Sequence, residues 1–105
     1  MSPRWLVAAL ARIRGLATRR KVYFTLKALR ELAGLGMDEE DACEVLASLV
    51  VTESAQRLRS KKTGEWMYVF KPEVGGIPVY LKVILRADCV VISFHEERHR
   101  GHEDR

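Results

Sequence analysis

Two side chains capable of acid–base chemistry, Tyr80 and His95, fall on neighbouring strand-like segments. Residues 78–86 and 89–95 are rich in apolar and β-branched residues, and the short stretch between them suits a hairpin turn. This pairing predicts Tyr80 directly opposite His95 on one face of a sheet. A histidine is the side chain that most readily exchanges a proton near neutral pH, and a tyrosine hydroxyl can donate one. The two residues together could therefore move protons during a cleavage reaction.

The second hairpin is predicted with a two-residue loop at Ala87 and Asp88. One face of the pair is then uniformly apolar and should pack against helices. The pairs on that face are Leu85 with Val90, Val83 with Ile92, and Leu81 with Phe94. The other face carries Arg86 with Cys89, Ile84 with Val91, Lys82 with Ser93, and Tyr80 with His95.

The first hairpin joins predicted strands at 55–61 and 65–71. A three-residue loop ending at Gly64 sets Arg59 opposite Met67, which puts the arginines and the aromatic residues on different faces. A two-residue loop would instead place Arg59 opposite Trp66 and mix the two kinds of residue, so the pattern favours the longer loop. The predicted basic face then gathers Arg57, Arg59, Lys61, Lys82 and Arg86 with Tyr80 and His95.

A basic face with a tyrosine beside a histidine suits a phosphodiester strand. RNA can be cut without a metal or cofactor when the ribose 2′-hydroxyl acts as the nucleophile. The reaction needs a base, an acid and cations that stabilise charge on the phosphate. We expect His95 to serve as acid or base and Tyr80 to donate a proton or orient the phosphate. Lys82, Arg59 and Arg57 would hold the phosphate and stabilise the transition state, with Lys82 and Arg59 counted as catalytic. Lys61, Lys71 and Arg86 are predicted to contribute to RNA binding.

Simpler interpretations exist for the same residues. His95 could be a polar residue at a strand end, and Tyr80 a half-buried sheet residue, neither with a catalytic task. His95, His99 and His102 could together suggest a metal site, although they straddle a strand end and a charged tail. A charge run is also usually a solvated face. The pairing of Tyr80 with His95 is the feature that favours a site.

Composition indicates one globular domain. The chain has 105 residues, 48% of them hydrophobic, and a net charge of +4 that favours an anionic partner. We expect a domain at 1–95 and a charged, solvated tail at 96–105. Arg12 and Arg14 interrupt the apolar N-terminus and argue against a secretory signal, leaving an amphipathic helix, with a transit peptide as the alternative. No apolar run is long enough to span a bilayer, so no membrane partner is expected.

The two cysteines, Cys43 and Cys89, have no metal-ligand spacing around them. They are expected to be buried as free thiols in a reducing compartment, which favours a cytoplasmic protein.

Three helices are predicted before the strands, each with a buried face. The fold class is therefore α+β, with N-terminal helices packed on one face of a mainly antiparallel four-stranded sheet. Thr25 and Asp38 are expected to cap the second and third helices, and Gly34 and Gly36 to end the second. The predicted buried residues of the three helices are Leu6, Leu10, Ile13, Leu16 and Ala17; Leu26, Leu29, Leu32 and Ala33; and Ala42, Val45, Leu46 and Leu49.

Three segments, 65–72, 79–83 and 91–96, resemble in content, order and spacing the MqsR family of toxins from type II toxin–antitoxin systems. The likeness continues more loosely through 25–38 and 52–54 and covers most of the chain. It implies a RelE-like fold and a metal-independent endoribonuclease that cleaves mRNA at short sequences. It also implies inhibition by an antitoxin partner, in that family a zinc-bearing, DNA-binding repressor.

Carried over residue by residue, the resemblance places the family's catalytic tyrosine on Tyr80. The family's lysine near the C-terminus falls on His95, and its glutamine after the tryptophan falls on Met67. Its first-strand lysine has no secure counterpart, and Arg57 or Arg59 could substitute. Histidine in place of lysine is chemically sensible, because imidazole is the better acid–base catalyst near neutral pH.

The sequence therefore predicts a toxin that cuts mRNA and thereby inhibits translation and growth. One alternative is a non-catalytic RNA- or DNA-binding module that uses the same basic face. Another is a ribosome-dependent nuclease of the RelE kind. The expected partners are mRNA and an antitoxin that is a DNA-binding repressor, and the free protein is expected to be a monomer or dimer.

Overall fold

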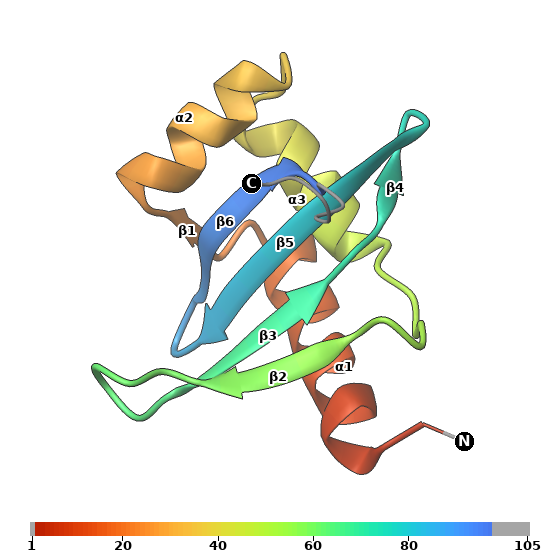
Figure 1. The fold of residues 1–105 in the computed structure, drawn as a ribbon, viewed down its shortest axis with the longest axis vertical. Helices are drawn as coiled ribbons and strands as arrows, with labels where there is room; N and C mark the ends of the chain where they lie inside the picture. Colours follow the sequence, from red (N-terminus) through yellow and green to blue (C-terminus); the bar gives the residue numbers. More distant parts are fainter. Residues whose placement is uncertain (1, 98–105) are drawn as a thin grey trace, which may run out of the picture.

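Three helices and a six-stranded sheet make up the structure, a computed structural model that describes residues 2–97 (Figure 1). Two of the helices follow a first short strand, and the remaining strands come afterwards. The elements are α1 (Arg4–Thr18), β1 (Val22–Phe24), α2 (Leu26–Gly34), α3 (Glu39–Ala47), β2 (Gln56–Arg59), β3 (Trp66–Phe70), β4 (Glu73–Val74), β5 (Ile77–Leu85) and β6 (Cys89–Glu96). The predicted α+β class, with helices before the sheet, is confirmed.

The helices begin where the sequence places their caps. The Thr25 hydroxyl accepts the Ala28 amide at 3.1 Å and starts α2. Asp38 and Asp41 form a reciprocal capping box that starts α3, in which each carboxylate accepts the other residue's amide. Such caps satisfy amides that have no partner within the helix. Both predicted helix starts are confirmed.

Most of the predicted core is confirmed, with two exceptions in α2. Leu26 is 71% exposed and Ala33 is exposed, whereas Ala28 and Leu32 face the core. The reason is that Leu26 and Ala33 lie on the side of α2 that faces solvent, whereas Ala28 and Leu32 lie on the side that packs against the rest of the fold. The core is formed by all three helices and the inner face of the sheet. Its largest fully buried side chains include Leu10, Ile13, Leu32, Leu46, Phe70, Leu81 and Phe94.

The sheet has the strand order β1-β6-β5-β3-β2, with β4 paired to one end of β5. β1 runs parallel to β6, and the other neighbours are antiparallel. The predicted four-stranded sheet is therefore wrong in strand number. Val22–Phe24 and Glu73–Val74 are too short to show a period in the sequence, and they form strands because long neighbours offer them partners.

The second hairpin confirms the predicted pairing at its far end and corrects it near the turn. Tyr80 lies opposite His95, and Leu81 opposite Phe94. The register then shifts between Lys82 and Val83, so that Val83 pairs with Val91 and Leu85 with Cys89. Ile92 is the extra residue on β6, as in a β-bulge. The turn is correspondingly longer than the predicted Ala87–Asp88 loop.

The first hairpin adopts the register that the residue pattern disfavours. Arg59 lies opposite Trp66, and Arg57 opposite Tyr68. Ser60 and Glu65 close the loop, with the Ser60 amide donating to the Glu65 carbonyl at 2.8 Å, and Gly64 adopts the predicted left-handed conformation (φ 77°). The predicted placement of Arg59 opposite Met67 is wrong. A slip of one residue moves every β2 side chain to the opposite face of the sheet.

One face of the sheet is covered by helices and the other is not. Figure 1 views the sheet from its uncovered side, with α1 and α3 behind it and α2 beside β6. We call this uncovered side the open face; it contains Tyr80, Lys82, His95 and the residues that alternate in phase with them. Within residues 2–97 no helix crosses it.

β6 extends to Glu96, and Glu97 also belongs to the part of the chain that the structure describes. The rest of the predicted tail, 98–105, lies outside the described residues. No helix within 2–97 is long and apolar enough to cross a membrane.

Candidate functional site

Tyr80 and His95 form a stacked pair on the open face. Their ring centroids are 5.2 Å apart, and the ring planes are inclined by 13°. The pair arises directly from the β5–β6 register, which places the two residues opposite each other. Both side chains are half-buried, so they remain within reach of a ligand on the face.

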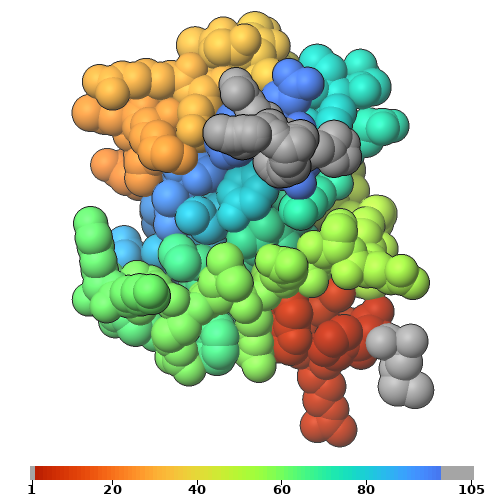
Figure 2. Space-filling view, viewed as in Figure 1, coloured from red at the N-terminus to blue at the C-terminus, as the bar shows by residue number. Residues whose placement is uncertain are grey.

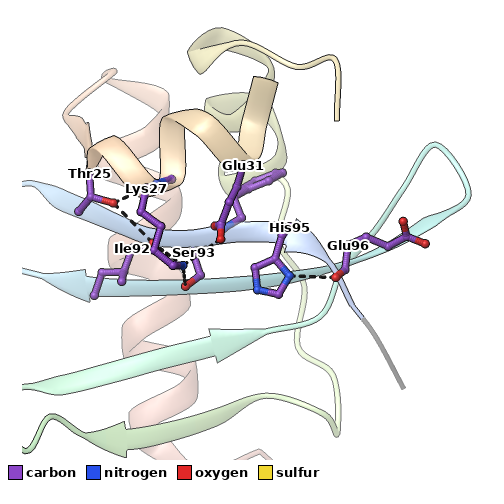
Figure 3. Close-up of polar contacts among 9 residues, drawn as sticks. Thr25, Lys27, Glu31, Ile92, Ser93, His95 and Glu96 are labelled. Atoms are coloured by element: carbon purple, nitrogen blue, oxygen red, sulfur yellow. Dashed lines mark hydrogen bonds and ion pairs between the residues drawn. The ribbon is translucent and has the colours of Figure 1, made fainter. Parts of the chain in front are cut away.

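The His95 ring is held in a defined orientation. Its Nδ1 lies 2.9 Å from the Glu96 carbonyl oxygen, as Figure 3 shows. A carbonyl can only accept, so this contact requires the proton on Nδ1 and leaves Nε2 as the acceptor in the neutral ring. The imidazole is therefore arranged to take up a proton through Nε2.

Lys27 was not predicted as a site residue, yet it reaches the same face. From the first turn of α2 its ammonium donates to the Ser93 hydroxyl at 2.9 Å and approaches the Ile92 carbonyl at 3.4 Å (Figure 3). Ser93 is buried and pairs with Lys82 across the β5–β6 ladder. The β6 strand thus has a lysine on each side of Ser93, Lys82 from β5 and Lys27 from α2. Ser93 lies two residue pairs along the ladder from Tyr80 and His95.

Glu31 fixes both Lys27 and the β6 backbone. Its carboxylate accepts the Phe94 amide at 2.9 Å and pairs with the Lys27 ammonium at 2.9 Å. Partial burial acts to raise the pKa of the Glu31 carboxyl, but the Phe94 amide and Lys27 outweigh it and hold that pKa below its ordinary value. β1 ends at Phe24. Beyond it, side chains of α2 take the place of a neighbouring strand and hydrogen-bond to backbone groups at the edge of β6.

Lys71 also comes to the Tyr80 end of the open face. Phe70 pairs with Leu81, so Lys71, the residue after Phe70, lies beside Tyr80. The Lys71 ammonium forms an ion pair of 3.0 Å with Glu97, which reaches it across β5 from the end of β6. This predicted RNA-binding cation is therefore already partnered by a carboxylate.

Arg57 and Arg59 lie on the other side of the sheet. Their guanidinium carbons are 4.2 and 3.9 Å from the centroid of the Trp66 ring, and Arg57 also lies 5.1 Å from that of Trp5. Trp5 belongs to α1, which packs on the covered face. The prediction that the two arginines share a face with Tyr80 is thus wrong. In the observed register Arg59 lies opposite Trp66, so both arginines lie on the covered side and contact the Trp66 ring.

The remaining predicted cations lie away from the Tyr80–His95 pair. Arg86 makes a two-point ion pair with Glu65, at 2.7 and 2.9 Å. Hydrogen bonding to Arg86 lowers the pKa of the Glu65 carboxyl to about 2. Lys61 is exposed in the β2–β3 loop. Met67 lies on the open face opposite Ile84, where a thioether cannot replace an amide's hydrogen bonds to RNA.

The structure therefore assembles four predicted residues, Tyr80, His95, Lys82 and Lys71, and adds Lys27, Ser93 and Glu97. The signal for Lys27 would have been the short strand before α2. Had Val22–Phe24 been predicted to pair with β6, the start of α2 would have been placed beside Ser93. Within 2–97 no three His, Cys, Asp or Glu side chains cluster as metal ligands. His99 and His102, part of the alternative metal site, lie outside the described residues.

A groove of about 730 Å³ lies away from this pair, between α3 and the β3–β4 segment. Its lining is largely apolar, with Val45, Leu49 and Phe70 among its residues and acidic groups such as Glu44. The groove presents no histidine or tyrosine. Its ionisable lining residues are Asp41, Glu44, Glu73 and Lys71, and neither member of the Tyr80–His95 pair is among them.

The sequence profile of the family described as "Motility quorum-sensing regulator, toxin of MqsA" matches residues 7–96. The chain belongs to this family, and the resemblance noted in the sequence is confirmed. It is thus a toxin of a toxin–antitoxin system, and membership implies an antitoxin partner of the MqsA kind. No curated protein matches the chain closely enough to add to this.

Proposed function

We propose that this toxin is a metal-independent endoribonuclease that cuts mRNA and so arrests translation and growth in the cytoplasm. The observation that carries the proposal is the Tyr80–His95 stack on the open face, with Lys82 and Lys27 beside it. A proton-transfer pair next to two ammonium groups is the set of functions that cleavage through the ribose 2′-hydroxyl requires.

In the proposed reaction, His95 Nε2 takes the proton from the 2′-hydroxyl as that oxygen attacks the neighbouring phosphorus. The bond from phosphorus to the 5′-oxygen breaks, and Tyr80 gives its hydroxyl proton to the departing oxygen. The products are a 2′,3′-cyclic phosphate and a 5′-hydroxyl, and solvent returns both side chains to their starting states. The opposite assignment, with His95 as acid, requires its doubly protonated form.

The lysines supply the electrostatic part of the proposed mechanism. Lys82 and Lys27 lie on the two sides of Ser93, so a phosphate bound there is approached by two ammonium groups, of which that of Lys27 is also paired with the Glu31 carboxylate. Charge on the phosphate oxygens rises during the reaction, and cations placed in advance stabilise that charge. Arg59, predicted as catalytic, lies on the covered side of the sheet and is not assigned a catalytic role here.

The antitoxin is proposed to restrain this activity by binding the toxin, and to act also as a DNA-binding repressor. The free toxin is proposed to be a monomer or a dimer. Neither assignment is needed for the chemistry, because the residues of the site come from one chain.

The test is incubation of the purified toxin with a mixed-sequence RNA in excess chelator, followed by mapping of the fragment ends. The proposal expects fragments that end in 2′,3′-cyclic phosphate and begin with a 5′-hydroxyl. Binding without cutting would contradict cleavage of free RNA. Repeating the reaction with translating ribosomes would then separate a ribosome-dependent nuclease from a module that only binds.

A further inference from the structure

Arginine and tryptophan side chains alternate in a row at the α1 end of the sheet. Arg57 lies between two indoles, 5.1 Å from the Trp5 ring centroid and 4.2 Å from that of Trp66. Arg59 lies 3.9 Å from the centroid of Trp66, and Trp5 contacts Tyr68 at 6.0 Å between centroids. We call Trp5, Arg57, Trp66 and Arg59 the arginine–tryptophan row.

The row is accessible from solvent. β2 is the outermost strand of the sheet, and both of its arginines are exposed, while the two indoles are half-buried. In Figure 2 the start of α1, in red, lies directly against the green β2–β3 segment. The row therefore forms a surface at the rim where the covered face meets solvent.

The charge of the row is not compensated by acids. Among the described residues no carboxylate pairs with Arg57 or Arg59, whereas Arg20, Lys71 and Arg86 all have carboxylate partners. The Arg59 guanidinium donates one hydrogen bond, to the Gly64 carbonyl at 2.7 Å. Contact with the indoles positions the two guanidinium groups and leaves N–H donors for an anion.

Cations interleaved with aromatic rings are the chemistry that binds single-stranded nucleic acid, with phosphates held by the cations and bases stacked on exposed parts of the aromatic rings. We propose that the arginine–tryptophan row binds single-stranded RNA at a site separate from the Tyr80–His95 pair. This inference rests on the proposed function, since the RNA bound by the row would be the part of the substrate strand that lies beyond the bond to be cut. Two strand spacings, roughly 10 Å, separate β2 from β5, so a strand of RNA can pass over the β2 edge and engage both surfaces.

Trp5 and Trp66 are the two tryptophans of the chain, so intrinsic tryptophan fluorescence reports on this row alone. The experiment titrates the full-length toxin with a 2′-O-methyl oligonucleotide, which lacks the nucleophile and stays whole. Poly-glutamate of matched charge serves as the second probe. Because the oligonucleotide is not cut, the result does not depend on whether the toxin is a nuclease.

We expect saturable quenching by the oligonucleotide that weakens as salt rises, and little change with poly-glutamate. Arg57→Gln and Arg59→Gln should each weaken the affinity about tenfold, equivalent to one stacking or phosphate contact. Lys62→Gln, an exposed change in the neighbouring loop, and Tyr80→Phe should leave the quenching nearly intact. Thermal melts establish that each variant is folded.

Three results would overturn the proposal. The first is no change in tryptophan fluorescence although the oligonucleotide binds, which would place the RNA elsewhere. The second is equal quenching by poly-glutamate, which would indicate an acidic protein partner. The third is unchanged affinity in both arginine variants. Failure of the proposed nuclease would appear separately, as unmodified RNA that binds and is not cut.

Discussion

The imidazole of His95 lies stacked on the ring of Tyr80, with 5.2 Å between the ring centroids. The stack forms because β5 and β6 recover, beyond the Ile92 bulge, the register that sets the two residues opposite each other. The hydrogen bond from Nδ1 to the Glu96 carbonyl fixes which nitrogen is free. A proton acceptor is thereby held beside the Tyr80 ring on the open face.

Lys27 should contribute to cleavage without being needed for folding. Its ammonium lies at Ser93, beside the predicted phosphate position, and more than half of its side chain is exposed. We expect Lys27→Met to slow single-turnover cleavage about 10- to 100-fold, since removal of one electrostatic stabiliser commonly costs that order or more. Arg30→Met, an exposed change on the same helix, is the control and should cut normally. Equal rates in both variants would remove Lys27 from the site.

Glu31 should matter for stability through the amide that it accepts. Glu31→Ala leaves the Phe94 N–H without its acceptor, and an unsatisfied, partly buried donor costs about 1–2 kcal/mol. Glu31→Gln keeps a carbonyl oxygen at the same position and should recover much of that loss. The measurement is the free energy of unfolding from denaturant titration. A Gln variant as unstable as the Ala variant would show that the charge, rather than the acceptor, is what β6 needs.

The Glu65–Arg86 ion pair should make stability fall in acid. In the folded protein the hydrogen bond from Arg86 lowers the pKa of the Glu65 carboxyl to about 2, below the ordinary carboxyl value. The ion pair therefore stabilises the fold fully at pH values above the ordinary carboxyl pKa. This stabilisation is lost as the pH falls through about 2, the pKa of Glu65 in the folded protein. We expect Glu65→Gln to lower the melting temperature at neutral pH and to match the wild type near pH 2.

The control for that experiment is Glu53→Gln, because Glu53 is exposed and makes no ion pair within residues 2–97. Its melting temperature should follow the wild type at every pH. A Glu65→Gln protein that also parallels the wild type throughout would show that the ion pair adds nothing to stability.

Cys43 and Cys89 should be unreactive in the folded protein. Burial raises the pKa of both thiols, that of Cys89 to about 12, and the side chains are 5% and 0% exposed. Little thiolate is therefore present near pH 8, and the reagent has no access. Alkylation followed by mass spectrometry should detect no rapid modification until denaturant is added. Prompt labelling of Cys89 in the native protein would contradict the packing of β6 against the core.

Tyr80 lies directly opposite His95 because the Ile92 bulge offsets the third residue of the turn, and neither of these features was predicted. What was predictable is that the two residues share a face, because the strands around them are long and one of their faces is uniformly apolar. Leu81 and Phe94 must face the core, and this fixes their neighbours on the opposite face. The cap residues Thr25 and Asp38 were predictable for a similar reason, since the hydrogen bonds they form are local in the chain.

The face occupied by Arg57 and Arg59 was not predictable from alternation. Polarity marks the faces of a strand only where one face is buried, and β2 lies at the outer edge with all its residues exposed. At that rim an arginine on the covered side reaches solvent and also stacks on Trp66. The contact with Trp5, which is distant in the chain, helps define this surface and leaves no periodic signal.

The most direct test of the central claim compares single-turnover RNA cleavage by the wild type, His95→Ala and Tyr80→Phe in excess chelator, with Arg30→Met as the folded control. If the stacked pair carries the chemistry, the wild type and Arg30→Met cut RNA, while each site variant loses at least about 100-fold in rate and still binds the RNA. Cleavage by His95→Ala and Tyr80→Phe at the wild-type rate would contradict the account, because the reaction would then be carried out elsewhere on the protein.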